Sequence, residues 1–115
     1  MPCNLSKDPT GQFDAFATSG QTATVFIKCE SSPQAKVTAA TLAGVKATVA
    51  NDGKVQLPAF PKNTSMLNLT IEGTQTGDDI QLLEDCENSQ VLSTQKVGAG
   101  ASGSNPVVGF KISAS

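Results

Sequence analysis

The chain has 115 residues, of which 38% are apolar, and ten acidic against eight basic side chains give a formal net charge of -2. It has no histidine and all its basic residues are lysines, so it lacks both the usual general base and the guanidinium group that binds phosphate in a bidentate manner. Because Trp, Tyr and any basic run are also missing, we expect neither an enzyme nor a nucleic-acid partner.

Alternation of apolar and polar residues predicts short strands along the whole chain. Asp52-Gly53 separates two alternating runs and predicts a hairpin, because glycine readily takes the positive φ of such turns. Glu87-Asn88-Ser89 predicts a second hairpin. The segment 36–42 is compatible with a strand or with one or two helical turns. Strands are expected at residues 13–17, 21–29, 36–42, 45–49, 55–57, 66–72, 80–86, 91–97 and 108–112.

Seven to nine short strands separated by turns predict one all-β domain over residues 1–115. An antiparallel β-sandwich is favoured, with a small β-barrel as the alternative. We expect a flexible N-terminal segment (1–11) and a mobile loop (98–105). That loop contains G-x-G-x-x-G, but a strand rather than a helix follows it, so it does not predict a dinucleotide site. No cofactor is expected.

Two of the three cysteines are predicted to face the core. Cys29 shares a strand face with Val25 and Ile27, and Cys86 shares one with Ile80 and Leu82. A Cys29–Cys86 disulfide is therefore predicted, worth about 4 kcal/mol in the chain-entropy model. Pairing of Cys3 with either one, or three free thiols, are the alternatives. A disulfide would place the protein in an oxidising compartment.

The beginning of the sequence, Met1-Pro2-Cys3-Asn4, makes Cys3 a candidate lipid anchor. A mature exported lipoprotein behind a start codon would begin in this way, and an ordinary start with an incidental cysteine is the alternative. No apolar run approaches the roughly 20 residues that span a bilayer, so any membrane contact would depend on that anchor. The expected location is the periplasm, the outer membrane or the cell surface.

Four acidic residues, Asp78, Asp79, Glu84 and Asp85, form the densest acidic cluster. Carboxylate oxygens are calcium ligands, so a calcium site is one interpretation. The D-x-[DN]-x-[DN]-G motif is missing, and Glu84 and Asp85 would face opposite sides of a strand. A solvated acidic edge that deters strand pairing is favoured instead. No catalytic or metal-binding residue is assigned.

The positions of Cys29 and Cys86, the hairpin-rich middle and the final alternating run VVGFKIS resemble an immunoglobulin-like sandwich. The antibody type would have a tryptophan between the cysteines, and a tyrosine where this chain has Glu84. The MPCN start, the lack of His, Arg, Trp and Tyr, and the Ser-, Thr- and Gly-rich tail are similar to small exported bacterial lipoproteins of unassigned function, some of which are surface antigens. These resemblances imply an immunoglobulin-like fold and an envelope location.

The function expected from the sequence is that of a non-enzymatic exported envelope or surface protein. It would be a monomeric interaction module, its protein partner unidentified, that binds through loops or a sheet edge. One alternative is a pilus or adhesin subunit in which VVGFKIS takes part in β-strand addition. A second alternative is a small protein inhibitor of an enzyme.

Overall fold

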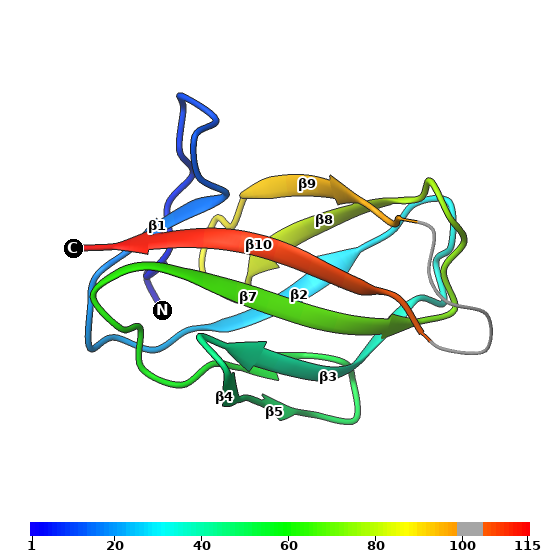
Figure 1. Ribbon diagram of the computed structural model, residues 1–115, viewed down its shortest axis with the longest axis horizontal. Helices are drawn as coiled ribbons and strands as arrows, with labels where there is room; N and C mark the ends of the chain where they lie inside the picture. Colours follow the sequence, from blue (N-terminus) through cyan, green and yellow to red (C-terminus); the bar gives the residue numbers. More distant parts are fainter. Residues whose placement is uncertain (99–104) are drawn as a thin grey trace.

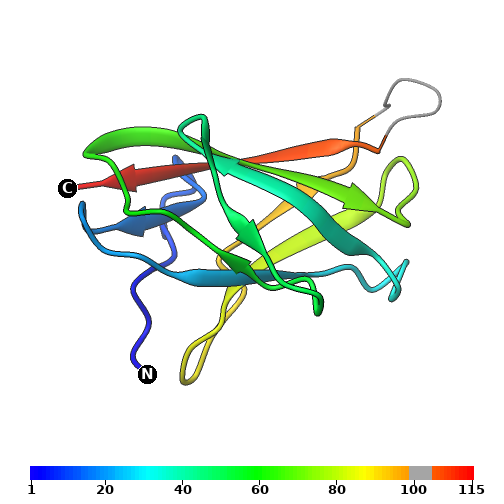
Figure 2. The same cartoon turned by 90° about the horizontal axis from the view of Figure 1, so that it is seen from below.

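The computed structural model describes residues 1–98 and 105–115, and these residues form two five-stranded sheets packed face to face (Figures 1 and 2). They include no helix, and hence none long and apolar enough to cross a membrane. The first sheet has the order β1 (Ala15–Ala17), β10 (Val107–Ala114), β7 (Asn63–Glu72), β3 (Lys36–Leu42), β4 (Val45–Lys46). The second has the order β5 (Thr48–Val49), β6 (Val55–Gln56), β2 (Thr24–Lys28), β8 (Asp79–Glu84), β9 (Ser93–Lys96).

The predicted all-β sandwich is confirmed, and both sheets are open rather than closed into a barrel. The strand pairs are antiparallel except for β1 and β10, which run parallel. The segment 36–42 is a strand rather than a helix.

Alternation builds the core between the two sheets. Along β7, every second side chain points into the core and is buried. The side chains between them face solvent, as expected for a strand with one wet face. Its neighbour β10 contributes Val108, Phe110 and Ile112, which are all buried. Phe60 and Phe110 are among the largest fully buried side chains.

The predicted strand 45–49 is divided between the two sheets. Residues 45–46 pair with β3, whereas residues 48–49 pair with β6. The chain therefore crosses from one sheet to the other at Ala47, a corner that alternation cannot reveal. The predicted hairpin that follows is confirmed, with Gly53 at a φ of 87°.

The N-terminal segment 1–11, for which the sequence predicts flexibility, makes specific contacts with the sandwich. Ser6 exchanges two backbone hydrogen bonds with Phe16 of β1, at 3.0 and 2.8 Å. Leu5 is buried in the core. In the predicted mobile loop (98–105), residues 99–104 lie outside the described part of the chain.

Asp14 links the two sheets at one lateral edge of the sandwich. Its carboxylate accepts hydrogen bonds from the Gln95 side chain at 2.8 Å and from the Ser93 hydroxyl, both on β9. It also accepts one from the backbone N–H of Lys111 on β10, at 2.6 Å. This single carboxylate therefore joins the edge strand of the second sheet to the first sheet.

Candidate functional site

The disulfide joins Cys3 to Cys86, with 5.1 Å between their Cα atoms, and Cys29 is a buried free thiol. The predicted Cys29–Cys86 pairing is wrong, because β2 and β8 are antiparallel neighbours in one sheet and their register places the two cysteines at opposite ends of β8. Lys28 lies opposite Gln81, so Cys29 is near the beginning of β8 while Cys86 follows its end. The strand from Ile80 to Glu84 alone spans roughly 14 Å. A disulfide requires Cα atoms about 4.4–6.8 Å apart.

The same disulfide changes the interpretation of Cys3. Its sulfur is bonded to Cys86 and is therefore not free to form a thioether with lipid. The proposed lipid anchor at Cys3 is incompatible with this arrangement. The structure instead has one of the alternative pairings predicted from the sequence, a disulfide between Cys3 and another cysteine.

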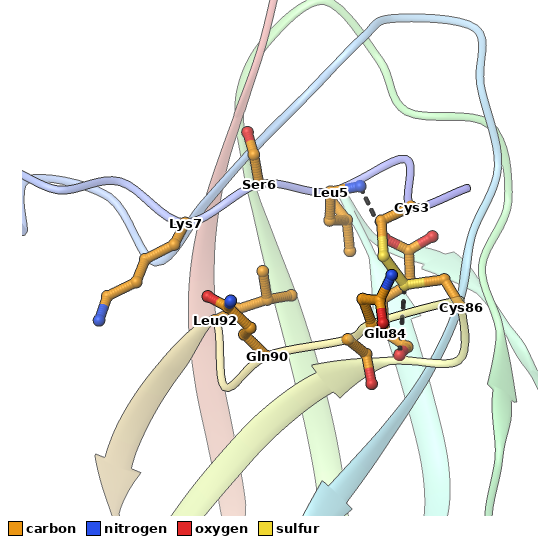
Figure 3. Close-up of a pocket in the computed structure, with 10 residues that line it drawn as sticks. Cys3, Leu5, Ser6, Lys7, Glu84, Cys86, Gln90 and Leu92 are labelled. Carbon is orange, nitrogen blue, oxygen red and sulfur yellow. Dashed lines mark hydrogen bonds between the residues drawn. A yellow bond between two sulfur atoms is a disulfide. The ribbon is translucent and has the colours of Figure 1, made fainter.

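Glu84, at the end of β8, holds the N-terminal segment beside the disulfide (Figure 3). Its side chain is buried. The backbone N–H of Leu5 donates to Oε1 at 2.7 Å, and that of Asn4 lies 2.9 Å from Oε1 and 2.8 Å from Oε2. The Glu84 carboxylate is therefore hydrogen-bonded although it is buried, and the N–H groups of Asn4 and Leu5 gain an acceptor that they would otherwise lack within the protein.

A pocket of about 210 Å³ lies next to this carboxylate and the disulfide. Cys3, Glu84 and Cys86 line one part of it, and the turn after β8 supplies polar side chains to another. A sulfur from each cysteine and a carboxylate oxygen of Glu84 lie within 4.8 Å of one another. We call these three residues the Cys3–Glu84–Cys86 cluster.

The acidic cluster predicted from the sequence is divided, and it forms no single calcium site among the described residues. Asp79 pairs with Lys96 at 2.9 Å, and Asp85 pairs with Lys54 at 3.2 Å, both on the surface. The prediction of a solvated acidic edge fits these two exposed residues. It is wrong for Asp78 and Glu84, which are buried at opposite ends of β8.

Asp78 is anchored much as Glu84 is, but by the loop between β2 and β3. It accepts a hydrogen bond from the Ser32 hydroxyl at 2.7 Å and one from the backbone N–H of Gln75 at 2.9 Å. These bonds, the Ser32 hydroxyl first, lower the pKa of the Asp78 carboxyl below its usual 3.8. The thiol of Cys29 contributes to lowering that pKa as well.

Asp8 and Asp14 are two further carboxylates with structural roles, and neither is among the sites predicted from the sequence. Asp8 accepts hydrogen bonds from the hydroxyl of Thr10 at 2.7 Å and from the backbone N–H of Phe13 at 2.8 Å. The Thr10 hydroxyl is the main reason that the pKa of Asp8 is lowered. The run Asp8-Pro9-Thr10-Gly11 is a turn signal that could have predicted this loop. No local signal marks Asp14, whose partners lie on distant strands.

A groove of about 390 Å³ runs between the loop 7–14 and β9, the edge strand of the second sheet. The backbone N–H of Val97 donates to the backbone carbonyl of Asp78 at 2.8 Å, and N–H groups alternate in direction along an antiparallel strand. The N–H groups of Thr94 and Lys96 therefore point away from β8. In the described part of the chain β9 pairs with β8 alone, so this edge can accept a further strand.

Comparison with known proteins adds no relative: no family model, no curated protein and no solved structure matches this chain. The immunoglobulin-like and lipoprotein resemblances therefore stay predictions.

Proposed function

We propose that the protein is an exported envelope or surface protein that acts as a non-enzymatic interaction module. The observation that carries this proposal is the groove between the loop 7–14 and β9, which lies beside an edge strand with outward N–H groups. An extended segment of a partner protein could pair with β9 there, with its side chains in the groove.

The buried carboxylates support a structural rather than a catalytic use of this chain's acids. The three carboxylates of Asp8, Asp78 and Glu84 each accept hydrogen bonds that fasten a loop or terminal segment. The disulfide supports export, because such bonds persist mainly in oxidising compartments.

The location is tested in cells that produce the protein, by alkylating thiols in situ before fractionation. We expect the protein in the envelope or secreted fraction, with Cys3 and Cys86 protected and Cys29 alkylated only after denaturation. A soluble cytosolic protein in which all three cysteines react would contradict the proposed export.

The binding edge is tested with a photo-cross-linking residue at position 94. We expect an adduct of defined mass from position 94, and none from Thr48, an exposed residue on the opposite edge strand β5. Lys96→Pro, which removes an outward N–H and suits an edge strand, should abolish the adduct. The same adduct from both positions would show that β9 is not the binding edge.

Assembly by strand addition, the alternative function, is constrained by the position of β10. All eight of its residues pair with β7, and three also pair with β1, so β10 is already an inner strand of its own sheet. Sedimentation over a range of protein concentrations distinguishes the two functions, because an isolated module stays monomeric and an assembling subunit does not.

A further inference from the structure

We propose that the Cys3–Glu84–Cys86 cluster becomes a zinc site when its disulfide is reduced. The proposal goes beyond the interaction function and does not depend on it. In the oxidised protein the two sulfurs are bonded to each other and hold residues 3–5 against β8. In the reduced protein the metal ion takes the place of that covalent link.

The donor set fits zinc. Two thiolates and one carboxylate are ligands that structural and catalytic zinc sites use, and the donor atoms here already lie within 4.8 Å of one another. A divalent cation bound to all three groups would offset the repulsion between the two thiolates and the carboxylate that form its ligands. No other group of three such donors occurs among the described residues.

Glu84 is an oriented ligand before any metal binds. Oε1 accepts bonds from both Asn4 and Leu5, whereas Oε2 accepts only the one from Asn4. A carboxylate has about four acceptor positions, so Oε2 keeps the larger free capacity for a metal ion. The hydrogen bonds also fix the direction of that oxygen, as the outer partners of metal ligands do.

The sulfurs must separate before they can bind zinc. Tetrahedral zinc with bonds of about 2.3 Å places two sulfurs roughly 3.8 Å apart. Cys3 belongs to no strand and is exposed, so its side chain has room to move. The adjoining pocket of about 210 Å³ leaves space for a fourth ligand, such as water.

The chemistry needs a reductant, which we take to be a small dithiol. The dithiol transfers two electrons and two protons to the Cys3–Cys86 disulfide, so the S–S bond breaks, two thiols form and the reductant becomes a disulfide. Zinc then binds both sulfurs and releases the two thiol protons to solvent. The metal itself is neither oxidised nor reduced.

The test compares the oxidised and reduced full chain, each freed of metal and of excess reductant under inert gas and titrated with Zn²⁺ and Co²⁺. We expect the reduced chain to bind one ion, with Co²⁺ giving a thiolate charge-transfer band and the visible bands of a tetrahedral ion. Zinc should raise the melting temperature of the reduced chain and leave that of the oxidised chain unchanged. A reduced chain that binds no ion would overturn the proposal, as would equal binding by the oxidised chain.

Variants assign the ligands. Cys86→Ser should lose the Co²⁺ thiolate band of this site, whereas Cys29→Ala should keep it. Glu84→Gln should weaken zinc binding by about tenfold or more, since loss of a ligand's hydrogen-bond partner alone typically costs that much. Asp85→Asn, at the neighbouring exposed acid, should leave affinity unchanged. Retention of the band by Cys86→Ser, or equal affinities for the Glu84 and Asp85 variants, would contradict this ligand set.

Discussion

Each end of β8 holds a segment that is distant in sequence, but the two ends hold it by different chemistry. At each end a buried carboxylate, Asp78 or Glu84, fastens a segment that is distant in sequence, and at each end a cysteine lies close by. At the Asp78 end the cysteine is the reduced Cys29, and at the Glu84 end it is oxidised.

The difference follows from how each fastened segment is connected. The loop that carries Ser32 is held on both sides by strands of the sandwich, β2 and β3. The segment that carries Asn4 and Leu5 leads into the three-residue β1. A few hydrogen bonds suffice for a loop whose ends are already fixed, whereas the N-terminal segment gains from a covalent link that closes a long loop.

The largest expected effect is the loss of the covalent link. The double variant Cys3→Ser/Cys86→Ser should lower the free energy of unfolding by about 4.5 kcal/mol, because the unfolded chain is no longer closed over a sequence separation of 83 residues. Urea denaturation without reductant measures the difference from the wild type. A loss below about 1 kcal/mol would mean that the disulfide adds little to the Glu84 contacts.

The next effect concerns the carboxylate at the same end. Glu84→Gln should cost about 2 kcal/mol, because a charged acceptor is lost and an amide N–H₂ faces the backbone N–H groups of Asn4 and Leu5. The control Asp85→Asn removes an exposed ion pair with Lys54 and should cost less than about 0.5 kcal/mol. Equal costs in urea denaturation would show that Glu84 does not fasten the segment.

A smaller effect on stability is expected from Cys29, at the Asp78 end of β8. Cys29→Ala should cost only about 1 kcal/mol, a typical loss for removing part of a buried side chain. Native Cys29 should react with alkylating reagents only on unfolding, since it is buried. A cost as large as that of the Cys3/Cys86 variant would indicate that Cys29 takes part in a cross-link.

The sequence predicts the strands well, because alternation is a local signal. Nearly every expected strand is found, including the hairpin at Gly53. Strand order is not local, and the cysteine pairing depends on it. Alternation predicts inward faces for Cys29 and Cys86, but only the register between β2 and β8 shows that they lie at opposite ends of β8.

The candidate site was less predictable than the fold. Glu84 occupies an inward position of β8 among apolar residues, and inward charge in a strand is a signal that it has a partner. Its partners are backbone groups of residues 4 and 5, which have no distinctive side-chain signal. Asp14 likewise bonds to strands far along the chain, so neither role could be read from one segment.

The smallest expected effect is a pH dependence at the Asp78 end. The Ser32 hydroxyl and the Gln75 N–H lower the pKa of Asp78 in the folded protein, while the unfolded chain keeps a value near 3.8. Below about pH 3.8 the unfolded state therefore binds more protons than the folded state. The stability that Asp78 contributes is complete above this range, and it is lost as the pH falls through the lowered pKa.

Asp78→Asn should remove that contribution, so the variant should be less stable than the wild type at neutral pH. The gap between the two should narrow as the pH falls below about 3.8, and urea denaturation at a series of pH values measures it. Asp8 also has a lowered pKa and keeps its own acid sensitivity in both proteins, so it cancels from the difference. If the difference in unfolding free energy between the two proteins stays constant across the series, the contacts with Ser32 and Gln75 depend on the shape of the Asp78 side chain and not on its charge. The Asp78 end of β8 would then be held without a contribution from charge, although its hydrogen-bond geometry resembles that of the Glu84 end.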